Sequence, residues 1–170
     1  MELLSGIPSV VYGFFGMATV VSLFGNSILS ACVLLGIMIL PTVIGIAESA
    51  LRAVPESYYE GALALGAGHS RSVFKVVLPA AKSGVLAAVI LGVGRAVGET
   101  MAVIMVAGNQ ARMPVSLFKG VRTLTANIVL EMGYAADLHR EALIATGVVL
   151  FVFIMIINLS FSALKRREKQ

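Results

Sequence analysis

The sequence predicts an all-α fold, a polytopic bundle of transmembrane helices. Of its 170 residues, 58% are hydrophobic and 13% are charged, whereas soluble domains carry roughly 25% charged residues. Residues 3–47 contain no charged side chain, and this stretch is more than twice the roughly 20 residues that a transmembrane helix needs. Together these observations exclude most classes of soluble enzyme and of nucleic-acid-binding protein.

Stretches without charge predict four membrane spans, at about residues 7–24, 28–47, 84–107 and 142–164. Gly25, Asn26 and Ser27 separate the first two spans, because Gly and Asn in sequence favour a turn. Pro41 is expected to kink or end the second helix. The start of the chain lacks the basic region of a secretory signal peptide, so no cleaved leader is expected before the first span. The single cysteine, Cys32, lies in an apolar run and is interpreted as a small hydrophobic residue.

The distribution of Lys and Arg predicts that both termini lie in the cytoplasm. An even number of spans places both termini on one side of the membrane, and Lys and Arg are in excess on the cytoplasmic side. Loop 48–82 and the C-terminal tail together hold eight of these residues, whereas loop 108–141 holds four. We therefore expect loop 48–82 to be cytoplasmic and loop 108–141 to be external, where a short helix over the outer mouth or a solvated loop would both fit.

Loop 48–82 contains signals for two short helices. Pro55 and Glu56 suit the first turn of one helix, because proline needs no backbone donor there and a carboxylate is favourable at the positive end of the helix dipole. Gly-Ala-Gly at residues 66–68 ends this helix, and a second one can run up to Pro79. Two interpretations stay open from these signals: an amphipathic hairpin on the membrane surface, or a docking element for a cytoplasmic protein.

Arg95 and Glu99 are the only charged residues in the third predicted span. Each would cost about 2.5–3.5 kcal/mol if it faced lipid, so we expect both to face the interior of the bundle or a solute pathway. Their spacing of four places both side chains on one face of a continuous helix. Gly94 and Gly98, which are also four residues apart, predict a packing face that another helix can approach closely.

Two functions of this charged pair stay open. It can be a buried ion pair that holds helices together, or it can line a pathway for an oxyanion. The arginine guanidinium offers two parallel donors to a tetrahedral oxyanion, and Thr100 adds a hydroxyl group. Glu99 can accept a hydrogen bond from the P–OH group of hydrogen phosphate, which sulfate lacks. The hypothesis is that Arg95 attracts the anion and that Glu99 favours phosphate over sulfate.

Loop 48–82 resembles the E-A-A-x3-G-x9-I-x-L-P coupling loop in permease subunits of bacterial ABC importers. The resemblance implies that the loop fits a cleft on a separate ATPase subunit, with a glutamate as polar anchor and a glycine as backbone turn. Gly replaces Ala at the second position, which lowers the local helix propensity by about 1 kcal/mol. The residues that carry the match are Glu60, Gly61, Ala62, Gly66, Val76, Leu78 and Pro79.

Two further stretches narrow this resemblance to the PstC-type permeases of phosphate importers. They are residues 94–103 (Gly-Arg-Ala-Val-Gly-Glu-Thr-Met-Ala-Val) and residues 6–13 (Gly-Ile-Pro-Ser-Val-Val-Tyr-Gly). The resemblance implies a helical bundle of the ABC importer permease type in a bacterial inner membrane, moving inorganic phosphate. It also implies a second, PstA-like permease subunit, a dimer of a PstB-like ATPase and an external PstS-like phosphate-binding protein. Members of that family have six spans and this sequence matches the last four, so the first two are expected to be lacking.

The sequence contains no motif for covalent chemistry. It has neither Gly-x4-Gly-Lys-Ser/Thr nor His-Glu-x-x-His. His69 and His139 stand apart from other metal-ligating residues. We therefore expect a transport subunit that is not an enzyme and that holds no metal and no cofactor, with ATP bound by the partner subunit. The alternatives are a permease for sulfate or molybdate, and a non-transporting membrane scaffold or inactive fragment.

Overall fold

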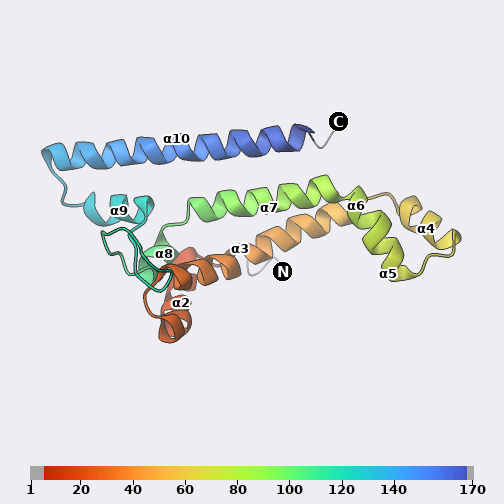
Figure 1. Ribbon diagram of the computed structural model, residues 1–170, viewed down its shortest axis with the longest axis horizontal. Coiled ribbons are helices and arrows are strands. Elements are labelled where there is room, and N and C mark those ends of the chain that lie inside the picture. Colours follow the sequence, from red (N-terminus) through yellow and green to blue (C-terminus); the bar gives the residue numbers. More distant parts are fainter. Residues whose placement is uncertain (1–5, 168–170) are drawn as a thin grey trace.

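The computed structural model of the protein describes residues 6–167, and within that range it is built of helices with one isolated β-bridge, between Gly108 and Val121. Figure 1 shows long helices lying side by side with the shorter elements gathered at the two ends. In chain order the elements are α2 (Ser9–Phe24), α3 (Ile28–Arg52), α4 (Glu56–Ala64), α5 (His69–Ser72), the π-helix η1 (Val73–Val77), α6 (Leu78–Ala80), α7 (Lys82–Val97), α8 (Met101–Val106), α9 (Leu124–Glu131) and α10 (Asp137–Arg167).

Two helices in the described part of the chain are long and apolar enough to cross a membrane. They are α3 and residues 137–161 of α10, and a third crossing is present if the bent pair of residues 69–80 and 82–97 counts as one. The second and fourth predicted spans therefore correspond to long apolar helices. The first predicted span corresponds to α2, which has 16 residues and is shorter than the roughly 20 that a perpendicular crossing needs.

The best-buried cluster in the described chain lies where α2, α3 and α8 meet. Leu34 of α3 and Val106 of α8 are fully buried there. Gly16 of α2 allows the close approach, since an added Cβ would lie 2.7 Å from the Leu34 side chain, and a Cβ at Gly13 would lie 2.5 Å from Met105. The cluster fixes the N-terminal half of α3 against α2 and α8.

The turn between α2 and α3 is the one that the sequence predicts at residues 25–27. Gly25 adopts a positive φ of 68°, a conformation that glycine tolerates at little cost. The Ser27 hydroxyl accepts a hydrogen bond from the Ser30 backbone N–H at 3.2 Å and caps the start of α3. Pro41 lies inside α3 and does not end it, because the helix continues to Arg52.

Helices α3 and α7 are antiparallel and pack through small residues. A Cβ at Gly84 would lie 2.5 Å from that of Ala50, and a Cβ at Gly92 would overlap the Val43 side chain. Because hydrogen takes the place of a side chain at both glycines, the two backbones can approach closely.

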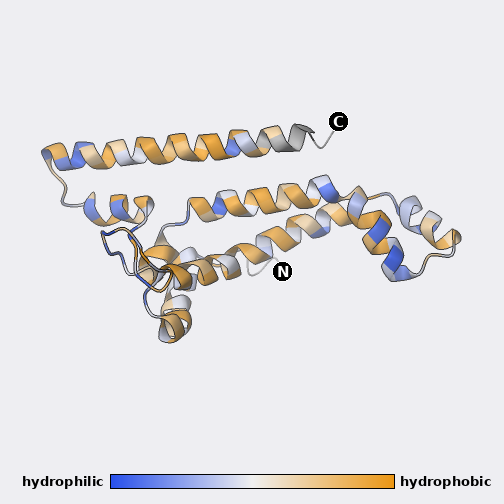
Figure 2. Cartoon of the chain, in the orientation of Figure 1, coloured by the Kyte–Doolittle hydropathy of each residue, from blue (hydrophilic) through white to orange (hydrophobic). Residues whose placement is uncertain are grey.

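Helix α10 runs back along α7, so that its C-terminal end lies at the same end of the molecule as α4 and α5 (Figure 1). It contacts α9 and α7. Only 6% of its apolar stretch is buried, compared with 22% for α3, and Figure 2 shows apolar colouring along most of its length. Most of the α10 surface is therefore available to lipid or to other helices.

Candidate transport pathway and coupling loop

Arg95 lies on the face of α7 that packs against α3. Gly84, Ala88 and Gly92 form a stripe at four-residue spacing, and Ala88 and Gly92 are buried. Arg95 follows Gly92 by three residues and therefore continues this stripe. It is exposed, whereas Gly92 contacts Val43 of α3. Arg95 thus lies about one helical turn beyond Gly92, the last residue at which α7 and α3 are in close contact.

The third predicted span is not one continuous helix, which corrects the sequence-based prediction. Helix α7 ends at Val97 and α8 begins at Met101. Glu99 contributes to this break, because its Oε1 atom accepts a hydrogen bond from the Ala102 backbone N–H at 3.1 Å and caps the first turn of α8. The hydroxyl of Thr100 donates to the Gly98 carbonyl at 3.3 Å, a local bond that competes with the helical pattern.

This break changes the relation between the two charged residues. Since the backbone leaves the helix between them, Arg95 and Glu99 do not share one face of a continuous helix, although they are four residues apart. The two side chains form no ion pair within residues 6–167. In this structure Glu99 acts as a helix cap and Arg95 is free to meet another group.

Gly94 and Gly98 make no close helix contact within residues 6–167, the range that the structure describes. A Cβ at Gly94 would meet no atom within 4 Å, and one at Gly98 would meet only the Arg95 carbonyl at 3.9 Å. The close approaches on α7 lie instead at Gly84 and Gly92. A packing role for Gly94 and Gly98 toward another subunit stays a prediction.

Residues 53–81, which we call the coupling loop after the motif that they match, contain α4 and α5 joined by a tight turn at Gly66. This residue has a φ of +82° and follows the C-cap of α4. The Gly66 N–H donates to the Leu63 carbonyl at 2.8 Å and the Ala67 N–H donates to the Ala62 carbonyl at 3.1 Å. This pair of bonds is a Schellman motif, which favours glycine at the left-handed position. The glycine predicted as a backbone turn has that conformation.

A side-chain contact joins the two helices of the coupling loop. The Tyr59 hydroxyl lies 2.7 Å from His69 Nδ1, and the two rings meet edge to face with centroids 5.8 Å apart. Ala62 of α4 is buried, while Glu60 and Gly61 are exposed. The exposed residues of the matched motif are therefore available to a partner, and the buried one supports the fold of the loop.

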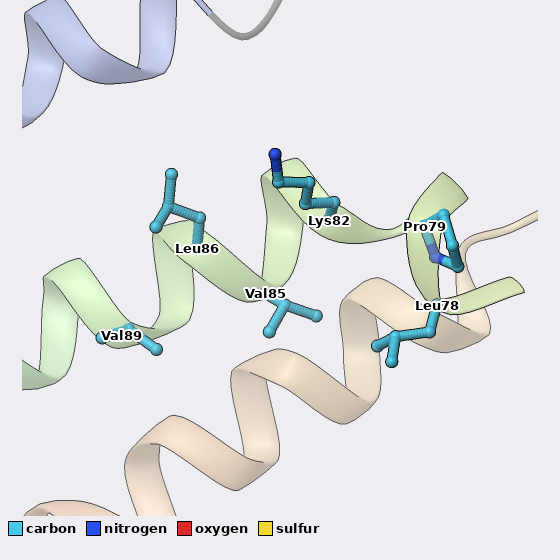
Figure 3. A pocket seen from close by; sticks show the side chains of 6 residues that line it. All are labelled: Leu78, Pro79, Lys82, Val85, Leu86 and Val89. Carbon is cyan, nitrogen blue, oxygen red and sulfur yellow. The ribbon is translucent and has the colours of Figure 1, made fainter. Parts of the chain in front are cut away.

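The matched residues Leu78 and Pro79 lie where the coupling loop joins α7. The helix over residues 69–80 contains the π-turn η1 and meets residues 82–97 at an angle of 68°. Proline supplies no backbone donor, which is compatible with a bend here. A shallow groove of about 400 Å³ lies at this bend. In Figure 3, Lys82 and Leu86 extend away from α3 and Val85 extends toward it.

An ionic cluster holds the opposite end of the molecule together. The Arg122 guanidinium donates to the Glu131 carboxylate at 2.6 Å and to the Asn109 carbonyl at 3.1 Å. His139 Nε2, in the first turn of α10, lies 3.9 Å from the same carboxylate. Arg122 therefore connects the segment after α8 with α9, and His139 adds an ionic contact from the start of α10 when its ring is protonated.

Hydrogen bonding changes the acidity of two groups in this cluster. The pKa of the Glu131 carboxyl is lowered from its ordinary value, first by a hydrogen bond from Tyr134 and then by the bond from Arg122. The same bond to Glu131 raises the pKa of Tyr134. Both shifts favour a charged Glu131 and a neutral Tyr134 at neutral pH.

These features define a class of protein: an apolar helical bundle with a protruding two-helix loop at one end and a charged residue on an interhelical face. The chain belongs to the family of binding-protein-dependent transport system inner membrane components, whose model matches residues 1–170. The resemblance to permease subunits of this family is thereby confirmed.

Individual relatives match nearly the whole chain. It is 40% identical to the "Probable ABC transporter permease protein YqgH" of Bacillus subtilis, over 99% of this chain and 58% of the relative. It is 32% identical to the phosphate transport system permease protein PstC of Pasteurella multocida (100% of this chain, 62% of the relative). It is 34% identical to PstC of Xylella fastidiosa (99% and 61%). The chain thus spans about three fifths of the length of these relatives. No solved structure matches it.

Sequence reasoning missed two of the contacts described above. Tyr59 with His69 and Arg122 with Glu131 join residues of different elements, 10 and 9 positions apart. His69 and His139 stood alone in the sequence, and no regular spacing marked their partners. The acidic residue after the apolar run of α9 was the only available sign of the ionic cluster.

Proposed function

We propose that this chain is part of the permease subunit of an ATP-driven importer that moves inorganic phosphate across the plasma membrane. Its family consists of inner membrane transport components, and several relatives at 32–34% identity carry the name of a phosphate transport system permease. By this proposal the chain has no enzymatic activity, holds no cofactor and relies on a separate subunit for ATP hydrolysis.

The observation that carries the substrate assignment is the position of Arg95. This cation lies on the stripe of α7 that faces α3, beyond the last contact at Gly92, and it is exposed with no ion-pair partner in the described part of the chain. A guanidinium group binds a tetrahedral oxyanion through two parallel hydrogen bonds, each worth about 1.5–3 kcal/mol when charge-assisted. Thr100, after the helix break, supplies a further hydroxyl group.

Glu99 caps helix α8 in addition to its proposed function in phosphate recognition. Because its carboxylate caps α8 through the Ala102 N–H, its position is fixed relative to that helix. In the proposed pathway the other carboxylate oxygen accepts the hydrogen bond of a P–OH group and so favours hydrogen phosphate over sulfate. Capping and recognition use different lone pairs and are compatible.

The coupling loop is the proposed contact to the ATPase. Its exposed residues Glu60 and Gly61 and the rigid turn at Gly66 would seat in a cleft of an ATPase subunit, and the bend at residues 80–81 would pass the movement to α7. The further proposed partners are a second permease subunit of the PstA type, a dimer of a PstB-like ATPase, and an external PstS-like phosphate-binding protein. The coupling loop and both termini are proposed to be cytoplasmic.

Transport by the reconstituted system tests this function. Proteoliposomes containing the permease, its partner permease, the ATPase and the phosphate-binding protein are assayed for uptake of phosphate and of sulfate. We expect Arg95→Gln to lower the apparent affinity for phosphate by about tenfold or more, since a charge-assisted hydrogen bond contributes about 1.5–3 kcal/mol, and Arg95→Lys to retain part of it. Phosphate uptake by Arg95→Gln equal to that of the wild type contradicts the assignment.

The same assay separates the alternatives. A permease for sulfate or molybdate would transport that anion and would not be inhibited by phosphate. A scaffold or inactive fragment would give no ATP-dependent uptake of any oxyanion, and a Gly66 substitution would have no effect on ATP hydrolysis.

A further inference from the structure

Residues 111–118, which we call the apolar loop, expose large hydrophobic side chains at the end of the molecule opposite the coupling loop. Met113 is 87% exposed, Val115 90% and Phe118 64%. Clusters of exposed apolar side chains mark a site of contact with a membrane or with another protein. Arg112, near the start of the loop, and Lys119, directly after it, are also exposed.

Backbone hydrogen bonds fix the apolar loop at the start of α3. The Ile28 N–H donates to the Lys119 carbonyl at 3.1 Å, and the Leu29 N–H donates to the Leu117 carbonyl at 2.9 Å. The loop therefore caps backbone donors in the first turn of a helix that is long and apolar enough to cross a membrane. Residues 117–119 lie level with the point at which that helix begins.

The base of the loop is fixed to α8 as well. The Val121 N–H donates to the Ala107 carbonyl at 3.0 Å, and the Ser27 N–H donates to the Val106 carbonyl at 3.1 Å. These bonds fix residues 117–121, which include Phe118, relative to α3 and α8. For a membrane-spanning α3 this segment lies at the boundary between hydrocarbon and headgroups, and Val115 and Met113 precede it directly in the sequence.

We propose that the apolar loop is an interfacial anchor, in which Met113, Val115 and Phe118 contact lipid acyl chains while Arg112 and Lys119 meet lipid phosphate groups. Apolar side chains flanked by cations are the chemistry that binds a phospholipid surface. A protein docking from the aqueous side would instead have to bury these side chains above the bilayer boundary. The anchor holds the start of α3 at a fixed depth, whatever solute is transported.

Depth measurements with a fluorescent label test the anchor. The sequence has one cysteine, so a Cys32→Ala background allows single labelling, with the environment-sensitive fluorophore NBD, at Val115→Cys or at the control Ser70→Cys in α5. The protein is placed in phospholipid nanodiscs with or without brominated acyl chains. We expect blue-shifted emission and bromine quenching for the label at position 115, and neither effect at the exposed position 70.

Two results overturn the anchor. One is emission at position 115 as red as that in water. The other is blue-shifted emission that brominated lipids do not quench, because this shows burial against protein. A double variant, Met113→Ser with Phe118→Ser, provides a second test and should reduce the quenching at position 115. Unchanged quenching in a double variant with the helicity of the wild type also contradicts the proposal. Transport of phosphate does not enter any of these readouts.

Discussion

At the scale of single residues, the two glycines Gly61 and Gly66 of the coupling loop have different structural functions. Gly66 has a φ of +82°, which an L side chain adopts only with strain. Gly61 lies inside α4, where an added Cβ would meet no atom within 4 Å. The first glycine is required by the backbone, whereas the second only weakens the helix.

This difference gives a paired prediction. Gly66→Ala should destabilise the coupling loop by about 1 kcal/mol or more, because alanine is disfavoured in the left-handed region. Gly61→Ala should stabilise α4 by up to about 1 kcal/mol, because alanine is the better helix former. Hydrogen exchange of the α4 amides measures both effects, and equal protection in the two variants would refute the distinction.

A second prediction at this scale concerns pH. The pKa of Glu131 is lowered from an ordinary value of 4.5 by the bonds from Tyr134 and Arg122. The ionised carboxylate therefore contributes stability that is fully present above that value and is lost as the pH falls through the lowered pKa. The melting temperature of the detergent-solubilised protein should drop between about pH 4.5 and lower pH. Glu131→Gln should have a lower melting temperature at neutral pH and a smaller drop, and an identical pH profile would contradict the prediction.

At the scale of helices, the contact between α3 and α7 depends on glycines at particular positions. Gly92 faces Val43 without room for a side chain, whereas an added Cβ at Gly94, two residues later, would meet no atom of another element within 4 Å in the described part of the chain. The two residues lie on different sides of α7, so the chain provides its own matched control.

Substitution by valine should separate the two sides of α7. Gly92→Val should destabilise the chain by about 1–3 kcal/mol through overpacking, and Val43→Ala should restore part of the loss. Gly94→Val should leave the stability of the isolated chain nearly unchanged, as measured by denaturant unfolding in mixed micelles. If Gly94→Val prevents co-purification with the second permease, the predicted packing role of Gly94 is supported; equal destabilisation by both variants would refute the geometry.

The elements show which parts of the fold a sequence can predict. The turn at Gly25–Ser27 and the turn at Gly66 follow from local chemistry, so the sequence was sufficient for both. The uncharged stretches of the sequence predict one continuous helix through Arg95 and Glu99 and do not predict the break at Gly98–Thr100, where the Glu99 carboxylate accepts a hydrogen bond from a backbone donor of α8. The contacts of Tyr59 with His69 and of Arg122 with Glu131 join separate elements, and their geometry depends on how those elements pack.

At the scale of the whole molecule, the polar and apolar parts are sorted along the long axis. Figure 2 shows hydrophilic colouring in α4 and α5 at one end and in α9 and the start of α10 at the other, with the long helices mostly apolar between them. This sorting is what a bilayer imposes, since polar side chains are stable only outside the hydrocarbon region. The membrane character of the chain was predictable from composition, because burial in lipid replaces burial in a core.

The distribution of contacts has a consequence for α10. The ionic cluster and α9 attach its first turns, whereas the remainder of its apolar stretch is largely uncovered. A helix that is attached at its N-terminal end keeps that position while its tilt angle can change, so the tilt of α10 depends on the lipid and the helices around it. Charge reversal at Glu131 would weaken the N-terminal attachment and thereby change the tilt of the whole helix, including residues far from the substitution.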